Sequence, residues 1–271
     1  RAALVAVGVA GLVVAPLFRL VVREPARSPA RSDAIPVGRV FAMLAAKPSF
    51  WLLSLGAASG SMIGYGLGFW LPSLLRRSFA LDLVGAGQFY GFLLLIGGVA
   101  GVLAGGVLGD RLGARDRGAY ARVPAICYLL AGPLFAAGIL APSTSSAFVL
   151  LLVPQALSLV WLPVVVTAIQ HLVPRPMRAT AGAAFLLVNN LIGLGAGTVV
   201  LGALSDGLTA RFGDDALRYA ILCGLSLYLL ASLLMWLAVR PLRRDWVDEE
   251  DEEGGSGARN PLLSAVARTG S

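Results

Sequence analysis

The stretch GGVLGDRLGARDRG, residues 105–118, places a cluster of charged side chains between two long apolar runs of the chain. The charged residues are Asp110, Arg111, Arg115, Asp116 and Arg117. Glycine recurs at every fourth position before them, at residues 97, 101, 105 and 109. The stretch therefore predicts a helix that packs closely against a neighbour and then ends abruptly in water.

Apolar residues dominate the rest of the chain. Of the 271 residues, 57% are hydrophobic and 14% are charged, whereas about a quarter are charged in an average soluble domain. Apolar runs occur at 2–22, 50–75, 88–109, 123–141, 147–170, 179–203 and 217–239. Each run is long enough to cross a hydrocarbon core of roughly 30 Å as a helix. Because lipid offers no partners to backbone groups, the sequence predicts an all-α integral membrane protein.

The basic residues behind the formal net charge of +7 are distributed unevenly between the segments that connect the apolar runs. Seventeen of the 22 Lys and Arg residues fall in alternate connecting segments, among them Lys47, Arg115, Arg175 and Arg243. The positive-inside rule places these segments and the C-terminal tail in the cytoplasm. We therefore expect a multi-pass protein of the cell (inner) membrane whose surroundings are the lipid bilayer, with no nucleic-acid partner.

Composition divides the chain into four parts. Residues 1–22 are expected to form one transmembrane helix, and residues 23–48, with four prolines, a cytoplasmic loop between two bundles. Residues 49–240 are expected to form a six-helix bundle, and residues 241–271 a disordered cytoplasmic tail that opens acidic and becomes rich in Gly and Ser. Because residue 1 is an arginine leading directly into an apolar run, we expect an upstream part of the protein to be missing.

The bundle region contains an internal repeat. GVLGD at 106–110 corresponds to GALSD at 202–206, and CYLLA at 127–131 corresponds to LYLLA at 227–231. A unit of three helices reverses the chain direction, so the second unit is inverted in the membrane, which is typical of secondary transporters. The glycine series at 97–109, and a second one at 56–68, predict helices that approach closely and can slide.

The charged stretch resembles the signature loop of the major facilitator superfamily. Gly106, Asp110, Arg111, Gly113 and Arg115 match its Gly-x-x-x-Asp-Arg-x-Gly-x-Arg pattern, although the family usually has a further basic residue at position 114. The resemblance implies that these five residues form a cytoplasmic gating motif. It also implies that 2–22 is helix six and is followed by the six-helix C-terminal bundle of a major facilitator fold, whose partner is the missing N-terminal bundle. We expect Asp110 to lie at the positive end of a helix in that bundle, with the arginines pairing nearby acids.

A second segment resembles the spinster-like branch of that superfamily. It is QHLVPRPMRATAGAAFLLVNNLIGLGAGTVVLGALSD at 170–206, followed by LRYAI at 217–221. This resemblance implies a secondary active or facilitative transporter that works by alternating access on a small organic or lipid-like solute, with protons as a candidate coupling ion. Drug or metabolite efflux, and organic-anion symport, stay open as alternatives within the superfamily.

Polar residues inside the apolar runs are candidates for substrate contacts, because unpaired polar groups are costly in lipid. They are Ser61 and Tyr65 in 50–75, Gln155 and Ser158 in 147–170, and Asn189 and Asn190 in 179–203. Ser54 shares a helix face with the first two. Hydrogen bonding between helices is the alternative for all of these residues. Trp70 and Trp161 are either cavity walls or ordinary packing residues.

Catalytic constellations are missing from the sequence. No paired carboxylates, Ser-His-Asp set, Cys-His set or metal-ligand spacing occurs at membrane depth, so we expect neither an enzyme nor a metal or cofactor site. The sequence contains neither a ring of charged residues nor a repeated carbonyl-filter segment, so it does not predict a channel. Cys127 and Cys223 are expected inside helices as buried, apolar-like residues, and His171 at a helix end as a capping or interfacial residue. No acidic residue lies near the middle of an apolar run, so a proton carrier is expected only in the missing bundle.

Overall fold

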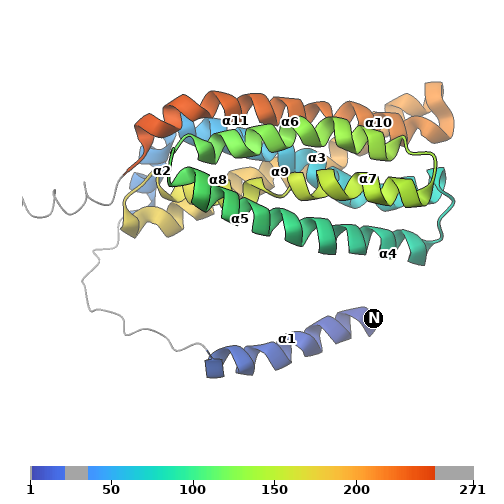
Figure 1. The fold of residues 1–271 in the computed structure, drawn as a ribbon, viewed down its shortest axis with the longest axis horizontal. Helices are drawn as coiled ribbons and strands as arrows, with labels where there is room; N and C mark the ends of the chain where they lie inside the picture. Colours follow the sequence, from blue (N-terminus) through green and yellow to red (C-terminus); the bar gives the residue numbers. More distant parts are fainter. Residues whose placement is uncertain (1, 22–35, 248–271) are drawn as a thin grey trace, which may run out of the picture. The chain divides into compact units, whose positions relative to one another are not determined.

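The computed structural model describes residues 2–21 and 36–247, in which every regular element is helical (Figure 1). The chain forms two units, Arg1–Ala34 and Ile35–Ser271. The described part of the first unit is α1 (Ala2–Val21), an apolar helix with Pro16 inside it and Arg19 in its last turn. The predicted first transmembrane helix is therefore helical almost throughout.

The second unit begins with a short helix and the first group of three predicted spans. Its elements are α2 (Val37–Ala45), α3 (Pro48–Ser78), α4 (Leu83–Leu93), the π-helical turn η1 (Leu94–Gly98), α5 (Val99–Gly113) and α6 (Ala119–Ile139). Proline at the first position of α3 and the Asp82 side chain at the start of α4 are helix-starting signals. α4, η1 and α5 form one continuous span, Leu83–Gly113.

The second group follows the same plan with more interruptions. Its elements are α7 (Thr144–Leu157), α8 (Trp161–Gln170), η2 (Arg175–Met177), α9 (Arg178–Phe212), η3 (Gly213–Asp215), α10 (Ala216–Gly224) and α11 (Ser226–Asp245). A proline removes the helical hydrogen bond to the carbonyl four residues earlier, so Pro154 and Pro163 weaken the helix around the break at residues 158–160. Gly213 adopts a φ of 53°, which glycine tolerates best, and the chain reverses there.

Among the described residues, five helical segments are long and apolar enough to cross a membrane. The spans are Pro48–Ser78, Leu83–Gly113, Ala119–Ile139, Thr144–Gln170 and Arg175–Asp245, and the last doubles back at Gly213 into α9 and the α10–α11 pair. Figure 1 shows the long helices of the second unit lying lengthwise beside one another. Large apolar side chains such as Leu103, Leu191 and Val199 are more than 60% exposed, as lipid-facing residues would be.

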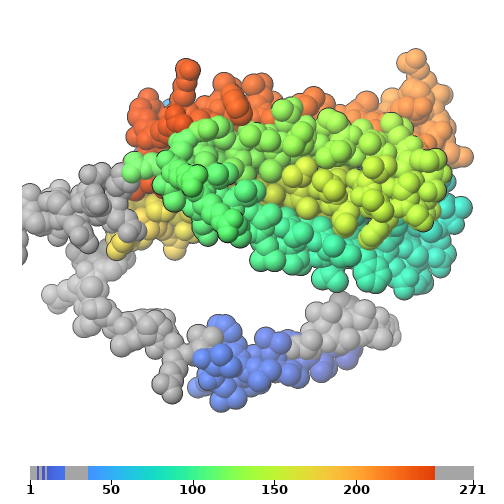
Figure 2. Space-filling model, viewed as in Figure 1, coloured from blue at the N-terminus to red at the C-terminus, as the bar shows by residue number. Residues whose placement is uncertain are grey.

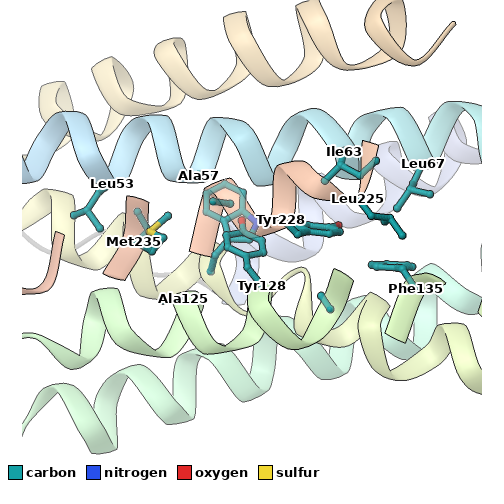
Figure 3. Packing of buried hydrophobic residues seen from close by; sticks show 14 of the residues in the cluster. Leu53, Ala57, Ile63, Leu67, Ala125, Tyr128, Phe135, Leu225, Tyr228 and Met235 are labelled. Atoms are coloured by element: carbon teal, nitrogen blue, oxygen red, sulfur yellow. The ribbon is translucent and has the colours of Figure 1, made fainter. Parts of the chain in front are cut away.

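The core lies between α3, α6 and α11, with α9 packed on α3, and it is built from small residues and stacked aromatic rings. Figure 3 shows Ala57, Tyr128, Phe135, Tyr228 and Met235 packed between α3, α6 and α11. On the outer face shown in Figure 2, α11, α6, α7 and the α4–α5 helix form adjoining bands.

Several boundaries differ from the prediction. Residues 23–48 were expected to form a loop, but α2 occupies Val37–Ala45, because Val40 and Leu44 share one helix face and are both buried against the bundle. The charged stretch is partly helical, since α5 continues through Gly113 and α6 begins at Ala119. At the tail, α11 extends to Asp245. The remainder of the predicted loop and tail, residues 23–35 and 248–271, lies outside the described residues.

Candidate functional site

A cavity of ≈ 360 Å³ lies among α3, α4, α6, the α7–α8 helix, α9 and α11. The structure brings together in its wall all of the polar residues proposed from the sequence, namely Ser61, Tyr65, Gln155, Ser158, Asn189 and Asn190. Most of these residues are buried, and Tyr65 is 39% exposed. Side chains far apart in the sequence thus share one polar site.

Paired hydrogen bonds join α3 to α9 at the cavity. The Ser61 hydroxyl donates to Oδ1 of Asn189 at 2.9 Å, and one helical turn further on the Tyr65 hydroxyl donates to Oδ1 of Asn190 at 2.9 Å. Asn190 also donates through Nδ2 to the carbonyl of Leu186 at 2.9 Å. Interhelical hydrogen bonding, the alternative considered for these residues, is therefore present at both asparagines.

Glycines allow these two helices to approach closely enough for such short side chains to meet. A methyl group added to Gly197 would overlap the backbone of Met62, and one added to Gly193 would lie 2.7 Å from Cβ of Ser61. Small residues at helix contacts are what lipid-embedded helices use for close packing. The glycines of α9 therefore position the Ser61–Asn189 hydrogen bond.

Irregular helix geometry shapes the α7 side of the cavity. Gln155 packs against Gly97 in the π-helical turn η1, where an added Cβ would lie 3.0 Å from Cγ of Gln155. Ser158 follows the last residue of α7 and donates to the carbonyl of Gln155 at 2.8 Å. π-Helical turns often occur at functional sites because they re-aim the side chains around them. Here one such turn faces the broken α7–α8 helix.

The glycine series at 97–109 packs as predicted, whereas the series at 56–68 packs only in part. Methyl groups at Gly101 and Gly105 would overlap the backbone carbonyls of Ala156 and Val160. A Cβ added to Gly56 would lie 3.2 Å from the Met235 side chain. A Cβ added to Gly64 would have no neighbouring atom within 4 Å, and Gly64 lines the cavity instead. Close packing between α5 and the α7–α8 helix is thus confirmed.

Aromatic rings form much of the remaining wall. Trp161 lines the cavity together with Tyr90, Phe135 and Tyr228, which the sequence interpretation did not propose. Tyr228 stacks on Phe135, with ring centroids 5.7 Å apart, and on Tyr128 at 5.4 Å (Figure 3). The two tyrosines are the corresponding residues of the CYLLA and LYLLA repeat, so that repeat was the signal that could have identified Tyr228. No charged side chain among residues 36–247 lines the cavity.

Three of the other candidates lie away from the cavity. The Trp70 indole donates to the carbonyl of Thr198 at 3.0 Å, which makes it a packing residue between α3 and α9. Ser54 is fully buried, and its hydroxyl has no hydrogen-bond partner among the described residues. His171 follows the last residue of α8, at a helix end as expected.

The residues of the proposed gating motif lie at the end of α5. Asp110, Arg111 and Arg115 are exposed, and Gly113 is buried against the ring of Tyr120. A Cβ added to Gly106 would have no neighbouring atom within 4 Å. Asp116, in the turn between α5 and α6, forms ion pairs with Arg122 and Arg243.

The end of α11 contacts three other parts of the bundle at this same end; we call Arg243, Asp245, Trp246 and Val247 the α11 clamp. Arg243 donates two hydrogen bonds to Asp116, at 2.9 and 2.7 Å. The Asp245 carboxylate accepts from the Ser49 hydroxyl at 2.7 Å, which joins the clamp to the first turn of α3. Val247 donates from its backbone to the carbonyl of His171 at 2.9 Å. The clamp thus ties the α5–α6 turn to the starts and ends of distant helices.

Trp246 is the central side chain of the clamp. Its ring stacks on His171, with centroids 4.4 Å apart, and on Tyr120 at 5.2 Å, while the Arg117 guanidinium lies 5.9 Å from its centroid. Next to it, Lys47 donates to the carbonyls of Leu172 and Asp245, each at 2.7 Å. Burial lowers the pKa of Lys47, and the charge of Asp245 opposes that shift.

Metal-ligating side chains do not cluster in the described ranges: no group of three His, Cys, Asp or Glu residues there could hold a metal ion. Cys127 is buried in α6 as expected, but the expectation was wrong for Cys223, which is exposed on α10. The cavity is therefore a site of neutral hydroxyl, amide and aromatic groups, suited to binding a molecule.

Comparison with known proteins shows the family and the fold of the chain. Residues 1–196 match the family model of the Major Facilitator Superfamily. An MFS-type efflux pump of Mycolicibacterium smegmatis (strain ATCC 700084 / mc(2)155) is 33% identical over 252 residues, which are 92% of this chain and 58% of that protein. The chain thus spans less than two thirds of the length of this relative.

Crystal structures of a bacterial homologue of the human lysosomal transporter Spinster share the fold. The inward-facing, unoccupied form gives a TM-score of 0.74 at 24% identity, over 90% of this chain and 60% of that one. The inward-facing, occupied form gives 0.66 at 26% identity, over 90% and 58%. The predicted all-α membrane fold is thereby confirmed. Because the family match covers most of its residues, the chain belongs to the Major Facilitator Superfamily.

Proposed function

We propose that this chain is the second bundle of a secondary transporter that moves a small organic or amphipathic solute by alternating access. The observation that carries the proposal is the cavity, where Ser61 of α3, Gln155 of α7 and Asn189 of α9 meet. Polar groups inside membrane helices are costly unless they pair with one another or serve a substrate. In transporters built from inverted repeats, such groups line a site near the bilayer midplane.

The domain plan predicted from the sequence is part of this proposal. α1 would be helix six of a first bundle, and residues 23–48, with α2 inside them, the connection between bundles. Residues 49–240, extended by the end of α11 at Asp245, would be the second bundle, and the residues after α11 a cytoplasmic tail. The relatives' greater length supports a first bundle elsewhere in the protein. The concentration of Arg and Lys at the end that holds the α5–α6 turn supports a cytoplasmic position for that end and for the α11 clamp.

Transport, rather than catalysis, is the function that the cavity supports. Its hydroxyls and carboxamides can donate to and accept from a solute, but they offer no carboxylate, imidazole or thiol to activate a nucleophile. The described efflux pump of Mycolicibacterium smegmatis supports outward movement of a drug or metabolite as the second form of the proposal. In both forms the cargo is a small molecule and the bilayer is the barrier that it crosses.

An untargeted vesicle assay tests the proposal. Everted and right-side-out membrane vesicles carrying the protein at its full natural length are incubated with a deproteinised cell extract, and the trapped solutes are identified by mass spectrometry. We expect at least one small organic solute to accumulate in wild-type vesicles and to be lost with a Gln155→Leu, Asn189→Leu double variant. Gln88→Leu, at an exposed position of α4 that does not line the cavity, serves as the control.

The control variant should accumulate the same solutes as the wild type. If wild-type vesicles trap nothing beyond vesicles without the protein, in either orientation, the transport proposal fails. If the double variant is present at normal levels and accumulates as much as the wild type, the cavity is not the solute site.

A further inference from the structure

The hydrogen bonds within the bundle use some polar atoms of the cavity and leave others available. Both amide atoms of Asn190 take part in one hydrogen bond each, since Oδ1 accepts from Tyr65 and Nδ2 donates to Leu186. Asn189 accepts from Ser61 at Oδ1, but its Nδ2 makes no hydrogen bond with a described residue. The Gln155 carboxamide makes none with a described residue either, since the Ser158 hydroxyl donates to the backbone carbonyl of Gln155 and not to its side chain. The cavity therefore keeps one available donor on α9 and one available amide on α7.

Tyr228 adds a third polar group from α11. Its ring lines the cavity, its side chain is 0% exposed, and its hydroxyl has no hydrogen bond of good geometry to a described residue. The side chain of Ser158 lies close to this hydroxyl. Ser158 already gives its proton to Gln155, so it can only accept from Tyr228. A buried hydroxyl without a good partner is costly, and a bound molecule could supply that partner.

The surroundings of these three groups are aromatic and uncharged. Tyr65, Tyr90, Phe135 and Trp161 contribute rings to the wall, and no Asp, Glu, Lys or Arg of residues 36–247 reaches it. An ion held against such a wall would lose its hydration without gaining a counter-ion from this bundle. A neutral ring can stack on the aromatic wall, while its polar substituents bond to the free amides.

We propose that Asn189, Gln155 and Tyr228 form a neutral subsite that selects uncharged aromatic solutes with amide, carbonyl or hydroxyl substituents. The proposal rests on the transport function proposed above and names the substrate class of the same cavity. Asn189 donates to an acceptor on the solute, the Gln155 carboxamide donates and accepts, and Tyr228 supplies a hydroxyl. These residues determine specificity, and the aromatic rings provide most of the contact area.

Binding of three radiolabelled probes tests the selectivity. The probes are chloramphenicol, a neutral aromatic amide with hydroxyl groups; tetraphenylphosphonium, an aromatic cation; and salicylate, an aromatic anion. The protein at its full natural length is held in nanodiscs, and equilibrium binding is measured for each probe. We expect wild type to bind chloramphenicol more tightly than either ion. Gln155→Glu should weaken chloramphenicol binding and strengthen tetraphenylphosphonium binding, each by about two- to tenfold, as expected for one hydrogen bond or one charged contact.

Matched variants separate specificity from folding. Gln88→Glu introduces the same charge at an exposed position outside the cavity and should bind all three probes like wild type. Tyr228→Phe should weaken chloramphenicol binding by about two- to tenfold. Tyr128→Phe removes the neighbouring enclosed hydroxyl of the same stack, which does not line the cavity, and should leave binding unchanged.

Wild-type protein that binds tetraphenylphosphonium or salicylate at least as tightly as chloramphenicol overturns the substrate class. Equal losses in Tyr228→Phe and Tyr128→Phe also overturn it, because they indicate a role in packing alone. The vesicle assay distinguishes this failure from failure of the transport proposal, since accumulation of any solute there preserves transport. Charged solutes trapped in the vesicles would leave transport standing and remove the neutral subsite.

Discussion

Asp110 and Asp116 lie six residues apart at the end of α5 and differ in what they contact. Asp116 accepts from Arg243 and from the backbone of Gly118 at 2.8 Å, and it pairs with Arg122. Asp110 is exposed and forms no ion pair with a described residue. The first aspartate is available for a contact outside this bundle, as the proposed gating role requires, while the second holds the α5–α6 turn to α11.

Alanine substitution should separate these two aspartates. Asp116→Ala removes the contact with α11 and should lower the free energy of unfolding by about 1 kcal/mol, since the ion pairs are partly exposed. Asp110→Ala should leave the stability of this bundle within about 0.5 kcal/mol of wild type. Thermal unfolding in nanodiscs measures both variants, and a larger loss for Asp110→Ala would contradict this distinction.

Glycine positions in the α4–α5 helix also differ sharply in what surrounds them. Gly101→Ala places a methyl group against the carbonyl of Ala156 and should destabilise the protein by about 1–3 kcal/mol. Gly91→Ala meets no atom within 4 Å and should stabilise the helix by up to about 1 kcal/mol. Thermal unfolding in nanodiscs compares the two alanine variants. Equal changes in stability would show that the close contact between α5 and α7 does not limit the stability of the protein.

At the scale of elements, the α11 clamp explains why α11 and the α5–α6 turn are held together. Trp246→Ala removes two stacked ring contacts, to His171 and Tyr120, and should lower stability by about 1–3 kcal/mol. Hydrogen exchange of residues 114–118 should accelerate in this variant. Trp236→Ala, at a 54% exposed position of the same helix, is the control and should not accelerate exchange there. Unchanged exchange in the Trp246 variant would mean that the clamp does not restrain the turn.

The membrane-spanning helices could be predicted from the sequence because the length of an apolar run is enough to indicate a membrane span. The polar residues of the cavity could be predicted too, because Ser61, Gln155 and Asn189 interrupt runs that are otherwise apolar. The helix α2 was missed because its two buried residues, Val40 and Leu44, are too few to form a recognisable run. The α11 clamp was missed because its contacts join residues up to 198 positions apart, which no local pattern records.

Tyr228 shows a further limit of pattern interpretation. The repeated CYLLA and LYLLA segments were visible, but periodicity does not say which repeated residue meets its counterpart. In the structure the paired tyrosines stack on each other between α6 and α11 (Figure 3), so one member of the pair reaches the cavity wall. Residues that correspond across an inverted repeat are therefore candidates for mutual contact.

At the scale of the whole molecule, the orientation in the membrane can be checked directly. The charge distribution predicts that the α5–α6 turn lies in the cytoplasm and that the turn between α6 and α7 lies outside. Cysteines introduced at Ala114 and Ser143, in a variant without Cys127 and Cys223, should react with an impermeant thiol reagent from opposite sides. Labelling of both positions from the outside would reverse or refute the proposed topology.

The positions of the acidic residues also predict that the proton carrier, if transport is proton-driven, does not lie in this chain. Asp82, Asp110 and Asp206 are exposed, and none of them lines the cavity. If transport is proton-driven, neutralising each to Asn in the full natural protein should slow accumulation at most and leave the proton-to-solute ratio intact. Loss of coupling with solute exchange preserved, in any of the three, would place the proton site in this chain.

The most direct test of the account is whether the cavity opens to each side of the membrane in turn. Tyr65 lines the cavity and is 39% exposed, so Tyr65→Cys, in the cysteine-free background of the full natural protein, reports access to the site. The account predicts that an impermeant thiol reagent labels this cysteine when applied from the cytoplasm and, in a separate experiment, when applied from outside. Ala58→Cys, at a fully buried position of the same helix, should stay unlabelled from both sides. Labelling of residue 65 from one side only, with or without transported solute, would contradict alternating access.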